Sequence, residues 1–189
     1  AIAIGLFAMQ SKGLDKVAGI FGPVMLVWFI CLAVTGLISI AAMPEILKAV
    51  NPYYGIKFLY KNGLAGFFVL SEVILCATGG EAMYADMGHL GKKPILNAWY
   101  FVFAAVFFNY MGQGVFAIQH PEVKYLLFGM VQHQAPFLYI PFLMLTIMAT
   151  IIASQAIISG IFSVVYQGIT TRLMPLMKVH YTSSHLKSQ

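Results

Sequence analysis

Charged side chains are scarce in this sequence. Asp, Glu, Lys and Arg together make up 9% of the 189 residues, whereas hydrophobic residues make up 60%. The mean hydropathy is +0.84. A soluble domain carries about 25% charged residues to cover its surface, so this composition excludes a soluble globular fold. It predicts an all-α integral membrane protein, built as a polytopic bundle of transmembrane helices.

Cysteine and acidic residues are also few. Cys31 and Cys76 both fall in apolar segments without a metal-ligand partner at a recognised spacing, so we expect no disulfide framework. The formal net charge is +5, but the basic residues lie in short loops between apolar runs. That distribution is typical of a membrane topology and not of a nucleic-acid-binding surface. No nucleophile and base fall at a usable spacing outside the membrane, so we expect neither an enzyme nor a cofactor.

Four apolar runs are long enough to cross a bilayer, which takes about 20 residues in a helix. The segments between them are short, and the chain starts within an apolar stub and ends in a basic tail. We therefore expect a piece of a longer polypeptide. The predicted segments are a truncated helix at 1–10, spans at about 20–42, 64–86, 95–118 and 137–167, a short interfacial helix at 45–50, a polar loop at 119–136 and a tail at 168–189.

The positions of the basic residues predict the orientation of these spans. The tail carries Arg172, Lys178 and Lys187 without an acidic residue, so the positive-inside rule places it in the cytoplasm. Counting back through four spans gives 7 basic residues inside against 4 outside. The expected location is the plasma or inner membrane of the cell.

The stretch from Cys76 to His89 places two glycines, a threonine and a carboxylate inside an apolar run. An ionisable side chain costs about 2.5 to 3.5 kcal/mol at mid-bilayer on insertion scales, so Glu81 is a candidate site residue. Gly79 and Gly80 each weaken a helix by roughly 1 kcal/mol relative to Ala, which allows the backbone to leave helical geometry. A membrane helix broken in this way is typical of a transporter binding site, where freed carbonyls coordinate a cation.

A structural interpretation competes with this one. Adjacent small residues also allow two membrane helices to approach closely, and a neutral Glu can serve as a hydrogen-bonding group between helices. The presence of Thr78 directly before the glycines and of Glu81 directly after them favours the site.

Other polar residues of the spans are weaker candidates. Glu72 either joins a proton path or snorkels to the headgroups, and both interpretations stay open. Asp86 follows near the second interface and is a candidate partner for a basic group at the cytoplasmic mouth. Gln155 and Ser159 lie on one face of the last span at four-residue spacing, with Ser154 beside them. For Ser154 and Ser159 the alternatives are an ion contact and a contact with a neighbouring helix.

Residues 78–89 read TGGEAMYADMGH, and residues 93–95 read KPI. This run resembles the motif TGAEALYADMGHFG…KPI of the KUP (HAK/KT) potassium uptake transporters. The resemblance continues through NPYY at 51–54, NYMGQG at 109–114 and IASQAIISG at 152–160, in the order of that family. Two departures stand out. Gly80 replaces a usual Ala, and Glu72 is not part of the family pattern.

The resemblance implies a potassium importer that works by proton symport and alternating access. It also implies the inverted-repeat, LeuT-like architecture of the amino acid-polyamine-organocation superfamily, with the four spans as helices five to eight. By that resemblance the broken helix at Thr78–Glu81 forms part of the ion site. Thr78 and the carbonyls around it would hold K⁺ and Glu81 the proton, because burial in low dielectric favours the neutral form of a carboxyl.

Tyr84, one turn after Glu81, is a candidate gate or hydrogen-bond partner, with plain packing as its alternative. The expected partners are K⁺, H⁺, the lipid bilayer, the remaining helices of the parent transporter and a second copy in a homodimer. Two other functions compete. One is an amino acid permease of the same superfamily, and the other is a non-transporting membrane subunit whose glycine patch joins helices.

Overall fold

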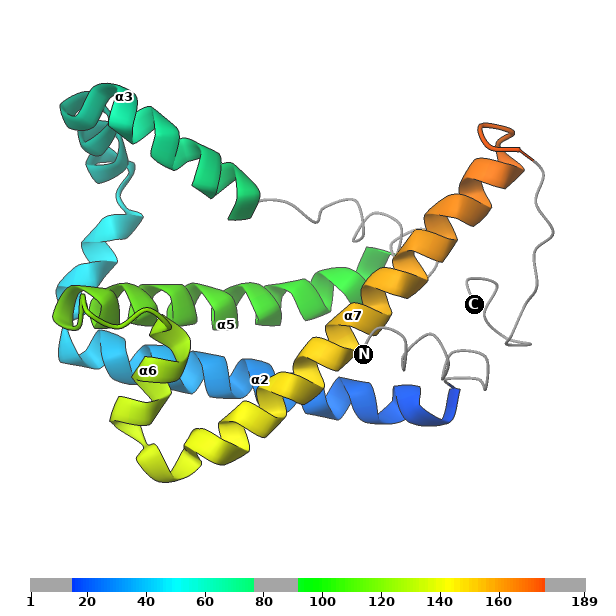
Figure 1. The fold of residues 1–189 in the computed structure, drawn as a ribbon, viewed down its shortest axis with the longest axis horizontal. Coiled ribbons are helices and arrows are strands. Elements are labelled where there is room, and N and C mark those ends of the chain that lie inside the picture. The colour runs from blue at the N-terminus through cyan, green and yellow to red at the C-terminus, as the bar shows by residue number, and fades with distance from the viewer. Residues whose placement is uncertain (1–14, 77–91, 176–189) are drawn as a thin grey trace. The chain divides into compact units, whose positions relative to one another are not determined.

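The computed structural model describes residues 15–76 and 92–175 of the chain. Every regular element in these two ranges is helical, which confirms the all-α prediction for the described residues. In chain order the elements are α2 (Asp15–Ala42), η1 (Pro44–Val50), α3 (Pro52–Cys76), α5 (Lys92–Gln119), α6 (Leu126–Gln134), η2 (Pro136–Leu138) and α7 (Tyr139–Thr170) (Figure 1).

Three of these helical stretches are long and apolar enough to cross a membrane. They are Gly19–Ala42 in α2, Lys92–Gln119 in α5, and Pro136–Thr170, which joins η2 and α7. Each coincides with a predicted span, because only a helix satisfies every backbone polar group within an apolar run of this length. The remaining predicted span, 64–86, is described as far as Cys76.

The second described helix, α3, begins at Pro52 and therefore before the predicted start at Leu64. Asn51 explains this early start, because its Oδ1 accepts a hydrogen bond of 3.0 Å from the Tyr53 backbone N–H. Pro52 then suits the first helical position, where no N–H is needed. The helix is broken at Gly63, which has φ 50° and ψ −124°, a left-handed conformation that favours glycine.

Residues 119–136, predicted as a polar loop, contain the helix α6 instead. This prediction was wrong because the apolar residues of the segment recur at helical spacing. Met130 and Val131 are buried against the rest of the fold, and Leu126 and Leu127 precede them by one turn. A short amphipathic helix therefore buries one face here despite the polar residues around it.

The chain divides into two compact units. One unit combines Ala1–Phe29, Ala82–Asn97 and Ile140–Gln189, and in it the Trp28 and Phe142 rings pack with centroids 5.2 Å apart. The other, called unit 2 below, combines Ile30–Glu81 and Ala98–Tyr139. It contains most of the buried side chains, including Val115 and Met130, which are fully enclosed.

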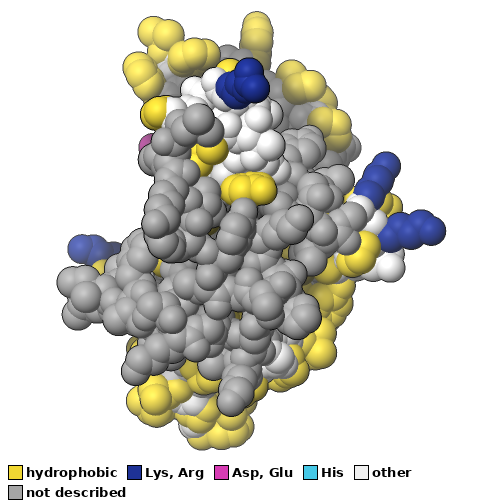
Figure 2. Space-filling view, turned by 90° about the vertical axis from the view of Figure 1, so that its right-hand side faces the viewer, with side chains coloured by type: hydrophobic (Ala, Val, Ile, Leu, Met, Phe, Trp, Pro, Cys, Tyr) yellow, Lys and Arg dark blue, Asp and Glu magenta, His cyan; other side chains and the backbone are white. Residues whose placement is uncertain are grey.

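The described surface is strongly apolar. Many large hydrophobic side chains are exposed on the helices, and hydrophobic side chains dominate the coloured part of the face in Figure 2, from which few Lys and Arg side chains project. An apolar surface of this extent is unusual for a soluble monomer and is expected where lipid or other transmembrane helices surround a chain.

Candidate functional site

The residues of the predicted ion site lie outside the described part of the chain. This applies to Thr78, Gly79, Gly80, Glu81 and Tyr84, and also to Asp86. The structure describes the helix that leads to them, α3 as far as Cys76, and the beginning of α5 at Lys92. Of the other candidates, the structure describes Glu72, Ser154 and Gln155, and it describes Ser159 as part of the helix α7 without its side chain.

Glu72 lies on α3, four residues before its described end, and its side chain is exposed. Among residues 15–76 and 92–175, its carboxylate has no ion-pair partner. An exposed acid on this helix is compatible with both interpretations given above, so the role of Glu72 stays a hypothesis.

Hydroxyl groups along α7 bond to their own helix. The Oγ1 of Thr146, the Oγ1 of Thr150 and the Oγ of Ser154 each donate a 2.8 Å hydrogen bond to the carbonyl oxygen four residues earlier. The hydroxyl proton of Ser154 is therefore occupied, while its oxygen lone pairs remain available as acceptors. Ser159 continues α7, but its side chain lies outside the described part of the chain.

Gln155 is a polar residue of α7 that is buried, with 4% of its surface exposed. Neither its amide nitrogen nor its amide oxygen has a hydrogen-bond partner among the described residues. The four-residue spacing predicts Gln155 on one face of this span, with Ser154 and Ser159 as the favoured contributors. A buried amide without a partner costs about 1 to 3 kcal/mol, so Gln155 is a further candidate for a polar contact on α7.

Unit 2 contains a close helix contact that the sequence did not reveal. Gly36 of α2 and Gly112 of α5 pack backbone to backbone, so that a Cβ added at Gly112 would lie 2.5 Å from the Gly36 Cα. A Cβ added at Gly36 would lie 2.7 Å from the Asn109 Cα. No side chain fits between the two helices at this point, which is the packing that small residues permit in membranes.

Asn109 lies beside this contact and is buried, with 4% of its surface exposed. Its Oδ1 has no hydrogen-bond partner among the described residues. Its backbone lies directly against Gly36, so Asn109 belongs to the packing contact between the two helices. The buried amide oxygen is in addition a strong acceptor within the α2–α5 contact.

Gln134, the last residue of α6, joins that helix to α2. Its Nε2 donates hydrogen bonds to the Ser39 Oγ at 2.7 Å and to the Thr35 carbonyl oxygen at 3.1 Å. Ser39 is buried, with 6% of its surface exposed. Gln134 and Ser39 are 95 positions apart in the sequence, so no local sequence pattern could have predicted that they pair.

Replacing Gln134 by leucine is expected to lower the free energy of unfolding by about 1 to 3 kcal/mol, because the substitution leaves the buried Ser39 hydroxyl without its partner. Gln132 is exposed on the same helix and provides a matched control. Thermal unfolding of the purified parent protein measures both variants. A Gln134→Leu variant as stable as Gln132→Leu would show that the amide does not hold α6.

His120, directly after the end of α5, packs against His133 in the last turn of α6. The ring centroids of His120 and His133 are 4.8 Å apart, and Phe116 packs on His120 at 4.7 Å. The Nδ1 of His120 lies 3.5 Å from an oxygen of the exposed Glu122.

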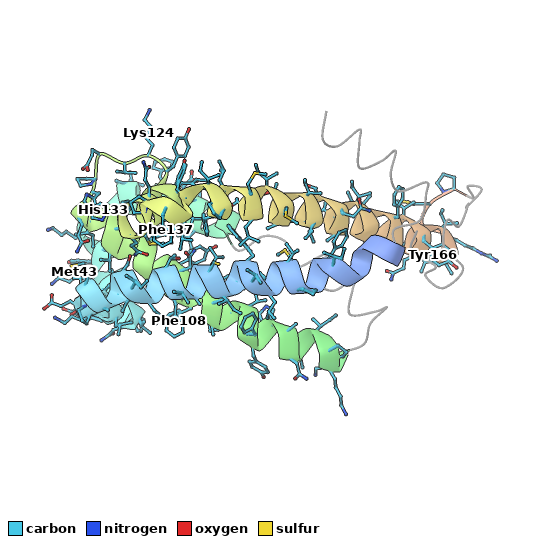
Figure 3. The ribbon with its side chains drawn as sticks, turned by 90° about the horizontal axis from the view of Figure 1, so that it is seen from below. Met43, Phe108, Lys124, His133, Phe137 and Tyr166 are labelled. Carbon is cyan, nitrogen blue, oxygen red and sulfur yellow. The ribbon has the colours of Figure 1, made fainter. Side chains whose placement is uncertain are left out.

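In Figure 3, His133 and Lys124 lie toward the same end of unit 2 as Met43, whereas Phe108 lies farther along α5. Among the described residues, no group of three His, Cys, Asp or Glu could hold a metal ion.

Comparisons with known proteins identify what the chain is similar to. Residues 1–189 match the K⁺ potassium transporter integral membrane domain. The chain is 70% identical over 189 residues to the probable potassium transport system protein Kup 1 of Geobacter metallireducens. It is 71% identical over 188 residues to the probable potassium transport system protein Kup of Trichlorobacter lovleyi. No solved structure matches the chain.

The alignments with these two relatives show how much of each protein is similar. All of this chain is covered in both alignments, and the chain spans 31% of the length of each relative. The resemblance found from the residues at 78–95 is therefore confirmed over the whole chain.

Proposed function

The chain belongs to the K⁺ potassium transporter family, and we propose that its parent protein imports potassium through a site that includes Thr78–Glu81. The observation that carries this proposal is the match of all 189 residues to that domain. The three helical stretches that are long and apolar enough to span a membrane also support this proposal, because an ion crosses a bilayer along a polar path between such helices. The relatives above are named potassium transport system proteins, which favours this function over an amino acid permease or a non-transporting subunit.

Neutral oxygens form the proposed potassium site. Potassium is large and weakly hydrated, so a set of carbonyl and hydroxyl oxygens can replace its water. The Thr78 hydroxyl and the backbone carbonyls of Thr78 and Gly79 provide such oxygens, because two adjacent glycines let the helix unwind there. In this proposal the helix is broken at Thr78–Glu81, within the inverted-repeat, LeuT-like bundle of the parent.

Glu81 is the proposed proton carrier. A carboxyl beside a cation site exchanges a proton under the influence of the ion's charge, so potassium and proton movement become coupled through local electrostatics. Alternating access of the parent would then carry both ions inward. Tyr84 is proposed to close or hydrogen-bond this site, and the tail at 168–189 to face the cytoplasm, as its basic residues favour.

Replacing Thr78 by valine is expected to raise the potassium concentration at half-maximal uptake by about tenfold, because losing one oxygen ligand weakens binding by about 1.4 kcal/mol. This half-maximal concentration is measured by rubidium uptake by the parent protein in a potassium-uptake-deficient bacterium, at matched membrane expression. Thr150→Val is the control, since the Thr150 hydroxyl donates to its own helix. An unchanged half-maximal concentration in Thr78→Val would remove Thr78 from the ion site.

A further inference from the structure

The segment Pro44–Asn62 begins where a membrane span ends. The candidate span of α2 ends at Ala42, and η1 starts two residues later at Pro44. After Gly63 the chain continues into the apolar part of α3, which we predict to enter the membrane. Both ends therefore hold this segment close to one membrane surface, and its helical form satisfies the backbone there.

The first part of α3 carries its lysines and tyrosines on one side. At 3.6 residues per turn, Tyr53, Tyr54, Lys57, Tyr60 and Lys61 fall within an arc of about 120°. We call this set the lysine–tyrosine face. The opposite side of the same turns carries Gly55, Ile56, Phe58 and Leu59, together with Asn62, whose Nδ2 donates a 2.8 Å hydrogen bond to the Phe58 carbonyl oxygen.

Contacts within the lysine–tyrosine face hold it together while leaving it exposed. The Nζ of Lys57 lies 5.9 Å from the centroid of the Tyr53 ring, and the Tyr53 and Tyr54 rings pack edge to face at 5.7 Å. Tyr60 is 93% exposed. A protein segment tethered at a bilayer with this exposure presents its rings and ammonium groups to the headgroup layer.

The lysines of this face have no acidic partner in the described part of the chain. Among residues 15–76 and 92–175, neither Lys57 nor Lys61 forms an ion pair, whereas Lys48 of η1 pairs with Glu45 at 3.5 Å. The two lysines are one turn apart on the same helix. They therefore leave two positive charges side by side, next to the aromatic hydroxyls and at a membrane surface.

We propose that the lysine–tyrosine face is a binding surface for the headgroups of anionic phospholipids. Phosphate oxygens accept hydrogen bonds from ammonium and phenol groups, and basic residues at the membrane surface favour anionic over zwitterionic lipid. The apolar side with Ile56 and Phe58 lies against the acyl-chain boundary, as in other interfacial helices. Gly63 then turns the chain from the surface toward the membrane interior.

Lipid competition tests this proposal on the purified full-length parent. Native mass spectrometry in an equimolar mixture of phosphatidylglycerol and phosphatidylcholine gives the relative affinity for the anionic lipid. Each lysine near an anionic surface contributes about fivefold, so Lys57→Gln with Lys61→Gln is expected to lower that preference by roughly twentyfold to thirtyfold. Lys57→Arg with Lys61→Arg retains the charge and should retain the preference. Lys124→Gln, an exposed lysine of the α5–α6 turn, is the control.

A spin label reports what covers the face. In a parent whose native cysteines are replaced, a nitroxide on Tyr60→Cys is expected to relax strongly when nickel is attached to lipid headgroups. A label shielded from both lipid-bound and soluble nickel would show that other helices or a second copy cover the face, and would overturn the proposal. So would a preference for phosphatidylglycerol that survives in the double glutamine variant or is absent from the wild type. Rubidium uptake by the same variants in phosphatidylcholine vesicles tests the proposed function separately.

Discussion

Replacing Gly36 by alanine is expected to lower the free energy of unfolding of the parent protein by about 1 to 3 kcal/mol, as overpacking of a tight contact does. The new methyl group would overlap the Phe108 carbonyl oxygen and the Asn109 Cα. These are backbone atoms of α5, so no side-chain rotation relieves the overlap. The two helices must separate, and the packing around the buried Asn109 and Val115 is lost with them. Thermal unfolding of the purified protein, read by size-exclusion chromatography after heating, measures the effect.

Gly19 provides a matched control in the same helix. A Cβ added at Gly19 meets nothing within 4 Å, so Gly19→Ala changes only the conformational freedom of the backbone. Alanine favours a helix over glycine by about 1 kcal/mol, and this variant should be as stable as wild type or slightly more stable. The same substitution should thus have opposite effects at two positions of α2. If Gly36→Ala unfolded at the temperature of Gly19→Ala, the close contact with α5 would be disproved.

Replacing Glu81 by glutamine is expected to remove the stimulation of potassium uptake at acid pH and to lower acid-pH uptake by about tenfold or more, within the range that one positioned proton-transfer group contributes. Glutamine keeps the size of the side chain and can hydrogen-bond, but it neither binds nor releases a proton. Rubidium uptake at acid and neutral pH, in a potassium-uptake-deficient bacterium with matched expression, measures both the stimulation by acid and the uptake at acid pH.

Glu45→Gln is the control for this change, because Glu45 is exposed on η1 and pairs only with Lys48 among the described residues. It should leave the pH response of uptake unchanged. A Glu81→Gln protein that transports like wild type with the same pH response would make Glu81 structural. The proton would then have to be carried by Glu72 or by a group outside this chain.

The sequence predicted those parts of the fold that depend on local composition. Apolar runs of bilayer length placed three helices, because hydrophobicity and backbone hydrogen bonding act over consecutive residues. Their ends were less accurate. Lys92 and Lys93 belong to α5, since a helix continues into polar flanks that a hydropathy criterion leaves out.

Contacts between distant residues could not be predicted in this way. Neither the Gly36–Gly112 contact nor the hydrogen bond from Gln134 to Ser39 leaves a local pattern, since each partner resembles many other small or polar residues in the chain. The helix α6 was missed for a different reason. Its apolar residues recur at helical spacing, but they occupy a segment of only nine residues that follows the polar residues His120, Glu122 and Lys124, so the whole stretch was interpreted as a polar loop.

The candidate ion site is a different case, because its chemistry lies in consecutive residues. Thr78, Gly79, Gly80 and Glu81 combine an oxygen ligand, backbone freedom and an ionisable group within four positions of an apolar run. A single stretch was therefore enough to recognise the family and to propose roles. The burial of Gln155 could not be predicted from its residue type, because it depends on contacts with residues elsewhere in the fold.

The most direct test of coupled potassium and proton import is a measurement of both ions in the same vesicles. The purified parent protein is reconstituted into vesicles that contain a pH-sensitive dye, with a permeant anion to prevent a membrane potential. An inward potassium gradient is then applied. We predict that potassium entry acidifies the lumen with wild-type protein and that the acidification is lost with Glu81→Gln. Entry of rubidium tracer without any change in luminal pH would contradict the coupling, and the absence of tracer entry would contradict potassium transport itself.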